Sequence, residues 1–466
     1  MSLPRNVLVA NRGEIARRVF RTCRRLGIGT VAVFSDADAD APHVRDADAA
    51  VHLPGTASAD TYLRGDLIIE AAQRSGADAI HPGYGFLSED ASFAAAVIAA
   101  GLTWIGPPAA AIDAMGSKLA AKARMAAAGV PVLPGGDVTG LDDGALLTLA
   151  EPTGYPVLIK ASAGGGGRGM RLVGDAGELL DAVVSAQREA ASAFGDGTVF
   201  VERYVQQPRH VEVQVIADAH GTVVDLFERE CSIQRRHQKI VEEAPSPAVD
   251  DDLRRRMGKA AVAAAAEVGY IGAGTVEFVL TPDGTFAFLE MNTRLQVEHP
   301  VTEEIAGLDL VEVQLRVAAG EPLGPEVIDA EIDGHAIEVR LYAEDPAAAY
   351  RPSTGTVERF DVPGAEGIRV ESGVDDGSSV SPHYDPMLAK VIAWAPTRRE
   401  AAARLSSALR RSLIHGVTTN RDLLVAVLEH PEFLAGATDT GFLDRNDPAG
   451  LTGSRRPEAT TRAHAA

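Results

Sequence analysis

The stretch from residue 274 to residue 300 reads GTVEFVLTPDGTFAFLEMNTRLQVEHP. Its first part has two runs of β-forming residues around a turn at residues 282–284, which predicts a β-hairpin. If Thr281 faces Phe286, then Glu277 faces Glu290, with Cβ atoms roughly 5 Å apart. Two carboxylates this close repel each other unless a cation lies between them, and Mg²⁺ typically takes one or two carboxylates together with substrate phosphates. The hairpin therefore predicts a magnesium site, with a solvent-diluted edge pair as the alternative.

The segment after Glu290 alternates polar and apolar residues. An extended backbone places one set of polar side chains on one face, namely Glu290, Asn292, Arg294, Gln296 and Glu298. On this face Arg294 suits bidentate binding of an anion, and Glu298 suits the role of a general base. The His299-Pro300 step favours an extended chain at residue 299 and argues against a helix running through it. The alternative is a solvated strand face, which the neighbouring metal site disfavours.

A glycine-rich loop lies upstream, where residues 155–174 read YPVLIKASAGGGGRGMRLVG. The loop formally contains GxGxxG at Gly164, Gly166 and Gly169, but both the dinucleotide fingerprint and the Walker loop require a helix to follow, and GK[ST] is absent. A strand-forming run follows instead. This pattern predicts a hairpin flap whose backbone N–H groups close over phosphates, with Lys160 beside it to bind phosphate oxygens. A purely structural turn is the alternative.

The N-terminal region alternates strand and helix patterns. Residues 6–10 form an apolar run, a helical pattern follows, and a second β run begins near residue 30. Continued alternation to about residue 108 predicts a parallel sheet covered by helices. A dinucleotide-binding domain is the alternative, but the first β-α turn lacks the glycine fingerprint. An Ala-rich helix is expected from about 109 to 129, ending at Gly129 with Pro131 beyond it.

Composition narrows the functional classes. The 466 residues suit about three domains. No apolar run is long enough to span a bilayer, and the N-terminus lacks a secretory signal, so we expect a cytoplasmic protein that does not bind membranes. A formal charge of −21 disfavours nucleic-acid binding. Cys23 and Cys231 form neither a disulfide framework nor a zinc motif, and we interpret both as reduced and not nucleophilic.

Lysine is scarce. The chain has 44 Lys and Arg residues in total, and the lysines occur only at positions 118, 122, 160, 239, 259 and 390. Since Arg replaces Lys almost everywhere, the remaining lysines are candidates for roles that a compact ammonium group fills and a guanidinium does not.

Nine motifs in order along residues 5 to 445 resemble the biotin carboxylase family: NRGEIARR, HPGYGFLSE, KASAGGGGRGM, HVEVQV, CSIQRRHQK, EMNTRLQVEHPVTE, HAIEVRLYAEDP, PSTG and SPHYDPMLAKVIAW. The resemblance implies an ATP-grasp fold of mixed α/β and α+β class. It implies a Rossmann-like pre-ATP-grasp domain over 1–115, an ATP-grasp domain over 116–330 with its lid at about 131–204, and a C-terminal biotin carboxylase domain over 335–446. The end of the chain is small, polar and without period, so we expect a disordered tail over 447–466. Ser117 and Ala163 depart from residues common in the family.

The resemblance also implies the roles of individual residues. Around ATP it places Lys118, Lys160, Gly166, Gly167, Glu202, Arg203, Tyr204, Val205, His210, Gln234 and His237. It assigns Mg²⁺ (or Mn²⁺) to Glu277, Glu290 and Asn292, in agreement with the hairpin argument. Bicarbonate is assigned to Lys239, Arg294 and the Val297 backbone, deprotonation of bicarbonate to Glu298, and stabilisation of the biotin enolate to Arg340.

The implied reaction has two steps. Bicarbonate attacks the γ-phosphate of ATP to give carboxyphosphate, which then carboxylates biotin. The sequence has no Met-Lys biotinylation motif and no carboxyltransferase region. Biotin is therefore expected on a separate carrier protein, with a carboxyltransferase subunit as a further partner in an acetyl-CoA or similar acyl-CoA carboxylase. The alternative is that the sequence is a fragment of a longer chain. The resemblance favours a homodimer. The alternatives are another ATP-grasp ligase acting on bicarbonate or an amine, and an inactive nucleotide-binding subunit.

Overall fold

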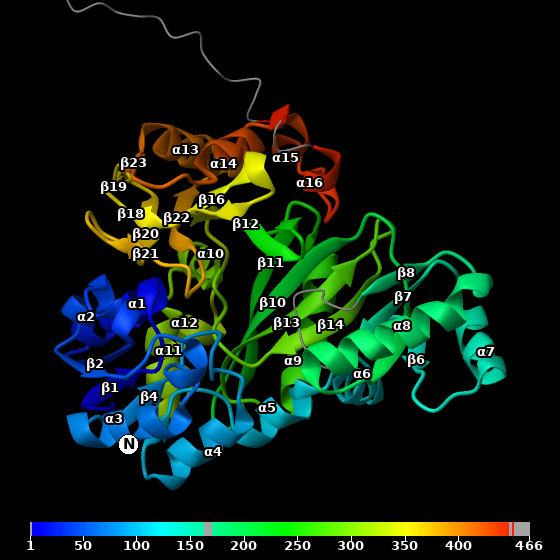
Figure 1. Cartoon of the computed structure of the whole chain (residues 1–466), viewed down its shortest axis with the longest axis horizontal. Helices are drawn as coiled ribbons and strands as arrows, with labels where there is room; N and C mark the ends of the chain where they lie inside the picture. The colour runs from blue at the N-terminus through cyan, green and yellow to red at the C-terminus, as the bar shows by residue number, and fades with distance from the viewer. Residues whose placement is uncertain (1, 163–169, 447–449, 452–466) are drawn as a thin grey trace, which may run out of the picture.

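The structure, a computed structural model, describes residues 2–162, 170–446 and 450–451. Gly166 and Gly167, expected at the tip of the lid hairpin, lie outside these residues, as does most of the expected tail. The chain folds into an N-terminal α/β unit, a central sheet, a lid and a C-terminal region that continues the central sheet (Figure 1).

The N-terminal unit has the predicted β-α-β start and a parallel sheet of order β3-β2-β1-β4-β5. The helical pattern that begins at Gly13 buries Ile15, Val19 and Cys23 against this sheet. The elements are β1 (Asn6–Val9), α1 (Gly13–Arg25), β2 (Gly29–Phe34), α2 (Pro42–Asp46), β3 (Ala49–His52), α3 (Gly65–Ser75), β4 (Ala79–His81), α4 (Ala91–Ala99) and β5 (Thr103–Trp104).

The single helix expected at 109–129 is wrong, because the structure has two helices, α5 (Ala109–Gly116) and α6 (Lys118–Ala127). Ser117 between them is extended, and its hydroxyl accepts a hydrogen bond from the Ala120 N–H at 3.4 Å. Serine is a favoured N-cap because its side chain satisfies an otherwise unpaired N–H of the first turn. The break therefore starts a new helix at Lys118.

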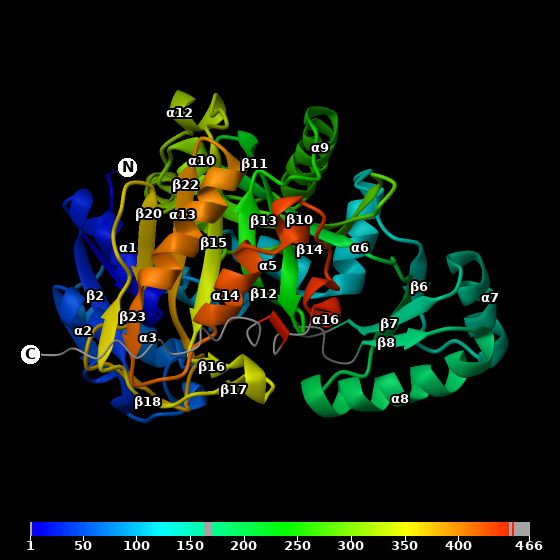
Figure 2. The same cartoon turned by 90° about the horizontal axis from the view of Figure 1, so that it is seen from above.

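The lid is a separate layer with its own apolar core. Its sheet has the order β6-β9-β7-β8, and the pairing of β7 with β8 confirms the predicted hairpin around the glycine-rich loop. The lid elements are β6 (Gly135–Asp137), α7 (Asp143–Thr153), β7 (Val157–Ala161), β8 (Arg171–Val173), α8 (Ala176–Phe194) and β9 (Val199–Arg203). Figure 2 shows this sheet to one side of the central sheet, with α6 between the two.

The central sheet has eight strands in the order β14-β13-β10-β11-β12-β15-β22-β20. Its last three strands come from the C-terminal region, so one sheet crosses the boundary expected near residue 330. The strands are β10 (Arg209–Ala217), β11 (Val223–Arg235), β12 (Gln238–Ala244), β13 (Gly272–Leu280), β14 (Phe286–Asn292), β15 (His335–Tyr342), β20 (Ile368–Ser372) and β22 (Met387–Ala395).

Helices pack around this sheet, and the C-terminal region also contains three separate two-stranded sheets, β16-β17, β18-β21 and β19-β23. The helices are α9 (Asp251–Glu267), α10 (His299–Ala306), α11 (Leu310–Ala318), α12 (Pro325–Ile328), α13 (Arg398–Arg411), α14 (Arg421–Leu428), α15 (Pro431–Leu434) and α16 (Phe442–Arg445). The short strands are β16 (Glu344–Asp345), β17 (Arg351–Pro352), β18 (Gly355–Thr356), β19 (Arg359–Asp361), β21 (Ser379–Val380) and β23 (Leu413–His415).

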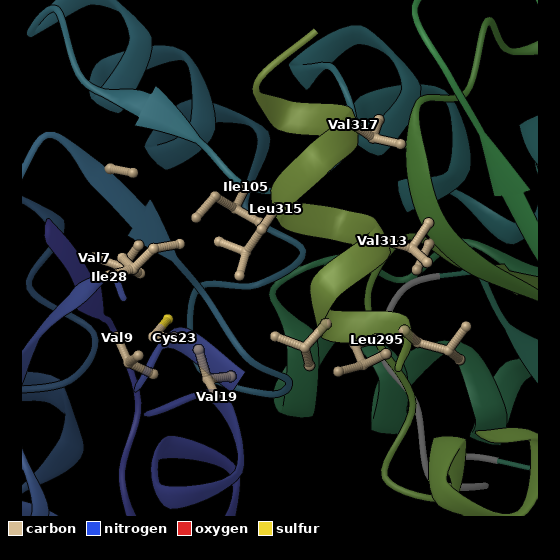
Figure 3. Packing of buried hydrophobic residues seen from close by; sticks show 14 of the residues in the cluster. Val7, Val9, Val19, Cys23, Ile28, Ile105, Leu295, Val313, Leu315 and Val317 are labelled. Carbon is tan, nitrogen blue, oxygen red and sulfur yellow. The ribbon is translucent and has the colours of Figure 1, made fainter. Parts of the chain in front are cut away.

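One apolar cluster joins the N-terminal unit to the rest of the molecule. Val19 and Cys23 of α1 lie in the same cluster as Val313 and Leu315 of α11 and the buried Leu295 (Figure 3). Packing of this kind fixes the segment after β14 against the N-terminal sheet. Within the described ranges, no helix is both long and apolar enough to cross a membrane.

Candidate active site

The central sheet, including its strand β15, the lid and α6 line an open cavity of about 360 Å³. Most of the residues predicted from the sequence line it: Lys118, Lys160, His210, Gln234, His237, Lys239, Glu277, Glu290, Asn292, Arg294, Val297, Glu298 and Arg340. They come from segments more than 200 residues apart in the sequence, so the fold brings them together. Residues 202–205 do not line this cavity.

The Glu277–Glu290 pair and the turn at residues 282–284 are confirmed, but the expected facing of Thr281 and Phe286 is wrong. Leu280, not Thr281, faces Phe286, and Thr281 closes the turn by a hydrogen bond from its N–H to the Thr285 carbonyl. If this pairing continued unchanged along the two strands, Glu277 would lie opposite Leu289. A β-bulge between Glu277 and Phe278 shifts the pairing by one residue and restores the predicted pair.

The backbone that carries the polar residues after Glu290 also differs from the expected extended strand. β14 ends at Asn292, and α10 begins at His299, so the prediction of an extended His299 is wrong. Pro300 is tolerated there because the N–H groups of a first helical turn need no intrahelical partner. All five polar residues of the predicted face nevertheless line the cavity, and the chain turn adds Val297.

Lys239 is the electrostatic centre of the cavity. Its ammonium group donates to Glu298 Oε1 at 2.7 Å, to Glu277 Oε1 at 2.8 Å and to a carboxylate oxygen of Glu212. Burial lowers the pKa of this ammonium group, but the three carboxylates outweigh burial and raise it well above its ordinary value. Lys239 is therefore protonated, and its three hydrogen bonds hold these carboxylates around one point.

Glu298 is fully buried between two cations. Its second oxygen, Oε2, accepts a hydrogen bond from Arg340 Nη2 at 2.9 Å. Burial raises the pKa of Glu298, but Lys239, Arg340 and Arg229 outweigh this effect and lower the pKa below its ordinary value. The carboxylate is consequently ionised at neutral pH and is available to accept a proton.

Arg340 is shared between two carboxylates. Its Nε donates to Glu242 Oε1 at 2.6 Å, while its Nη2 donates to Glu298. Burial together with the charge of Glu298 raises the pKa of Glu242 to about 7, although Arg340 opposes the shift. Glu242 faces Glu338 across β12 and β15, and that second carboxyl is also fully buried.

Arg294 is held by three side-chain acceptors and by the Leu295 carbonyl. Its guanidinium donates to Glu89 Oε2 at 2.9 Å, to Gln296 Oε1 at 2.7 Å and to Asn292 Oδ1 at 3.0 Å. Glu89 belongs to the loop after β4 and also accepts the Thr293 N–H at 3.1 Å. This planar group, fixed at the cavity wall, is suited to bind an anion bidentately.

The donor groups at the β13–β14 hairpin fit a hard divalent cation. Glu277 and Glu290 face each other, and the Asn292 side chain adjoins Glu277, to whose Oε1 it donates at 2.8 Å. Mg²⁺ prefers carboxylate and amide oxygens, so this set suits it. His210 Nε2 also lies 2.8 Å from Glu277 Oε2, and its Nδ1 lies 2.9 Å from Gln234 Nε2.

The lid side of the site is organised by Glu202. Its carboxylate binds Lys160 at 2.6 Å, and it is 3% exposed. The Arg203 side chain is exposed and donates to the Thr153 carbonyl, away from the cavity. Strand β9 ends at Arg203. The next residue, Tyr204, donates its N–H to the Pro156 carbonyl, and Val205 follows it.

Sequence reasoning missed several residues of the site: Glu89, Lys122, Glu212, Arg229, Glu242 and Lys390. Glu212 had a recoverable signal, because it lies opposite Glu277 in the β10–β13 register. Lysine scarcity also pointed to Lys122 and Lys390. The contact between Glu89 and Arg294 has no local sequence signal, because 205 positions separate the two residues.

Three family models match successive parts of the chain. The model described as "Biotin carboxylase, N-terminal domain" matches residues 4–112. The model described as "Carbamoyl-phosphate synthase L chain, ATP binding domain" matches residues 117–326, and the "Biotin carboxylase C-terminal domain" model matches residues 338–445.

Relatives cover nearly all of the chain. The biotin carboxylase of Halalkalibacterium halodurans is 53% identical over 94% of this chain and 97% of that protein. The methylcrotonoyl-CoA carboxylase subunit alpha of Oryza sativa subsp. japonica is also 53% identical over 94% of this chain, which spans 60% of that subunit. The propionyl-CoA carboxylase alpha chain of Ruegeria pomeroyi is 47% identical, and this chain spans 70% of it.

Solved structures show the same fold. The biotin carboxylase domain dimer of the Hydrogenobacter thermophilus 2-oxoglutarate carboxylase, in complex with MgADP, ADP and bicarbonate, matches with a TM-score of 0.92 and 45% identity over 97% of this chain and 99% of that chain. A biotin carboxylase from Campylobacter jejuni in a nucleotide complex matches with a TM-score of 0.91 and 43% identity over 95% of this chain and 99% of that chain.

Proposed function

Because this chain belongs to the biotin carboxylase family, we propose that it carboxylates biotin carried by a separate protein, as the first half-reaction of an acyl-CoA carboxylase. The chain is an ATP-dependent ligase that uses bicarbonate. The observation that carries the proposal is the position of Lys239, which hydrogen-bonds both Glu298 and Glu277 in one cavity. The proposed base and a proposed metal-binding carboxylate thereby share a single cation.

The proposed ATP site lies between the lid and the β13–β14 hairpin. Lys118 and Lys160 would bind phosphate oxygens, while Glu277, Glu290 and Asn292 would hold Mg²⁺. Bound magnesium would neutralise charge on the phosphates. The lysines and closure of the lid would supply the rest, because phosphoryl transfer depends mainly on positioning and electrostatic stabilisation. For His210, Gln234 and His237, which line the cavity, we propose contacts with the nucleotide. For residues 202–205, which do not line it, we propose contacts at the edge of the lid.

Bicarbonate would bind beside Lys239 and Arg294, against the Val297 backbone. Glu298 would take its proton, and the resulting oxyanion would attack the γ-phosphate to give ADP and carboxyphosphate. Glu298 suits this role because its carboxylate is ionised and each of its two oxygens is held by a hydrogen bond. Exclusion of water by the lid would protect carboxyphosphate from hydrolysis.

Biotin would approach through a second cavity of about 410 Å³ that shares Gln238, Val297 and Arg340 with the first. Carboxyphosphate would break down to CO₂ and phosphate, and the phosphate would take the ureido proton of biotin. Arg340 would offset the charge of the enolate that forms. Tyr84 and Glu14, which hydrogen-bond each other, line the same second cavity.

Production of ADP tests this function directly. We expect ATP hydrolysis that requires bicarbonate and Mg²⁺ and is stimulated by free biotin. If free biotin leaves ADP production unchanged, another bicarbonate-dependent ATP-grasp ligase becomes the better assignment. If no bicarbonate-dependent hydrolysis occurs at all, the chain is a nucleotide-binding subunit rather than an enzyme.

The acceptor and the partners form the finer part of the proposal. The relatives include methylcrotonoyl-CoA and propionyl-CoA carboxylase subunits, which supports an acyl-CoA acceptor of this general kind, with acetyl-CoA as a further candidate. We propose a biotin carboxyl carrier protein and a carboxyltransferase subunit as partners, a homodimer, and a cytoplasmic location. Recovery of the chain from its source cell with detection of co-purifying biotinylated proteins would identify the carrier.

A further inference from the structure

Lys122 has no role in the proposed function, although lysine is scarce in this chain. Lys118, Lys160 and Lys239 are assigned to substrates, Lys390 donates to the Val297 carbonyl at 2.7 Å, and Lys259 is exposed on α9. Lys122 lies on α6, and its side chain is only 14% exposed. A lysine in this setting needs a partner to offset the cost of burial.

The partner is Glu202, which is shared between two lysines. Its Oε1 binds Lys122 Nζ at 2.7 Å, and its Oε2 binds Lys160 Nζ at 2.6 Å. Burial raises the pKa of Glu202, but Lys160 and Lys122 outweigh burial and lower it, so this carboxylate is ionised. Two cations therefore face one anion, and the group keeps a net positive charge next to the cavity that Lys160 lines.

The two lysines come from different layers of the molecule. Lys160 and Glu202 belong to the lid sheet, on β7 and β9. Lys122 belongs to α6, whose Ala121 and Met125 are buried in the core under the central sheet. Figure 2 shows α6 between the lid and β14. The Lys122–Glu202 ion pair thus connects the lid to the body.

The spacing on α6 adds to this connection. Lys118 and Lys122 are four residues apart and so lie on one helix face. Lys118 Nζ lies 3.1 Å from Glu290 on the hairpin, whereas Lys122 binds Glu202 on the lid. One face of α6 therefore reaches both the proposed metal carboxylate and the lid carboxylate beside Lys160.

We propose that Lys122 is a positioning residue for ATP. Lys122 binds one oxygen of the Glu202 carboxylate, so that Glu202 neutralises only part of the charge of Lys160 and the remainder is available to phosphate. Without Lys122, Glu202 and Lys160 form a neutral one-to-one pair, and phosphate must break that pair to reach Lys160. The lid also loses an ion pair to α6. This inference rests on the proposed ATP site, and it concerns nucleotide affinity rather than the carboxylation of biotin.

The test is Lys122→Met, which keeps the apolar stem and removes the charge. We expect the Kd for MgATP, and the KM for ATP, to rise about tenfold, as for the loss of one charge-assisted hydrogen bond. We expect kcat and the KM for bicarbonate to stay within about threefold of the parent values, because the base and the anion site are untouched. Lys122→Arg keeps the charge and should restore most of the affinity.

Two controls separate positioning from a general loss of structure. Lys259→Met removes an exposed lysine and should leave the Kd for MgATP unchanged. In a Glu202→Gln background, Lys122→Met should have little further effect on that Kd, because the two residues act through one contact. An unchanged Kd for MgATP in Lys122→Met, or a full additional effect in the Glu202→Gln background, would overturn the inference. Since nucleotide binding is measured by titration calorimetry without biotin, a failure of biotin stimulation would count against the proposed function alone.

Discussion

Replacement of Glu298 by glutamine removes the proposed base while keeping its size. In the structure, Glu298 Oε1 accepts from Lys239 at 2.7 Å and Oε2 accepts from Arg340 at 2.9 Å. A glutamine oxygen can still accept from Lys239, but its NH₂ group then faces Arg340, donor against donor. General-base catalysis contributes typically about 10² to 10⁴ in rate, so we expect kcat for bicarbonate-dependent ADP release to fall by at least about 10².

The expected structural cost of Glu298→Gln is smaller than the loss of activity. Lys239 keeps Glu212 and Glu277, and Arg340 keeps Glu242, so neither cation is left buried without an anionic partner. One charge-assisted hydrogen bond is lost, which costs about 1.5 to 3 kcal/mol of unfolding free energy. The variant should therefore fold and bind MgATP with an affinity near that of the parent.

The assay is ADP release at saturating ATP, with and without bicarbonate, together with MgATP titration. Glu326→Gln, an exposed change on α12, serves as the matched control and should match the parent. Because the pKa of Glu298 is held low, its ionisation should produce no limb in the rate profile between pH 6 and pH 9. A Glu298→Gln variant that releases ADP within about tenfold of the parent rate would refute the assignment of this residue as the base.

Three further outcomes follow from the same geometry. Glu242 has a pKa of about 7 in the folded chain against an ordinary 4.5, so its stabilising contribution is complete below pH 4.5 and is lost as pH rises through 7. Glutamine does not titrate, so the melting temperature of Glu242→Gln, measured relative to that of the parent, should increase between pH 5 and pH 8. Glu290→Gln should raise the Mg²⁺ concentration that gives half-maximal ADP release, with recovery at high Mg²⁺, and an unchanged requirement would place the metal elsewhere. Leu405→Ala, in the core under β15 and β22, should lower the free energy of unfolding in urea by about 2 to 5 kcal/mol while the KM for ATP stays unchanged.

The sequence predicted side-chain faces better than it predicted backbone paths. Alternation from Glu290 to Glu298 identified the residues that line the cavity, although the chain leaves β-structure after Asn292 and starts a helix at His299. The reason is that burial of Leu295 in the cluster with α1 and α11 fixes which side chains point inward. A pattern of burial is readable locally, whereas the turn that achieves it depends on packing from distant elements.

The hairpin illustrates the same limit. Next to the turn, the two strands pair one residue away from the expected register. Glu277 and Glu290 are paired only because a bulge compensates for this shift. Bulges arise from local twist and from the packing of neighbouring strands, and these residues carry no glycine that would mark one. The break at Ser117 was missed, although a serine followed by helix-forming residues is a common N-cap signal.

The residues missed by sequence reasoning share a physical role, which is to neutralise the site. A chain with a net charge of −21 has to bind two anions, and its cavity is not an open positive pocket. Lys239, Arg294 and Arg340 are each already paired with carboxylates. At the proposed site, substrate binding would therefore exchange one partner of each cation for another, and its free energy would be the difference between the substrate contacts and the carboxylate contacts.

This exchange has a consequence for the proposed base. Lys239 is a principal reason why the pKa of Glu298 is low. Bicarbonate bound at the proposed site would take a hydrogen bond from the Lys239 ammonium group. It would add a negative charge beside Glu298 and weaken that ion pair, and both effects would raise the basicity of the carboxylate. The substrate would thus strengthen the base that deprotonates it, and proton transfer would be favoured only when bicarbonate is in place. Glu298 would thus be a weak base in the free enzyme and a stronger base once bicarbonate is bound, which is when the proton of bicarbonate has to be removed.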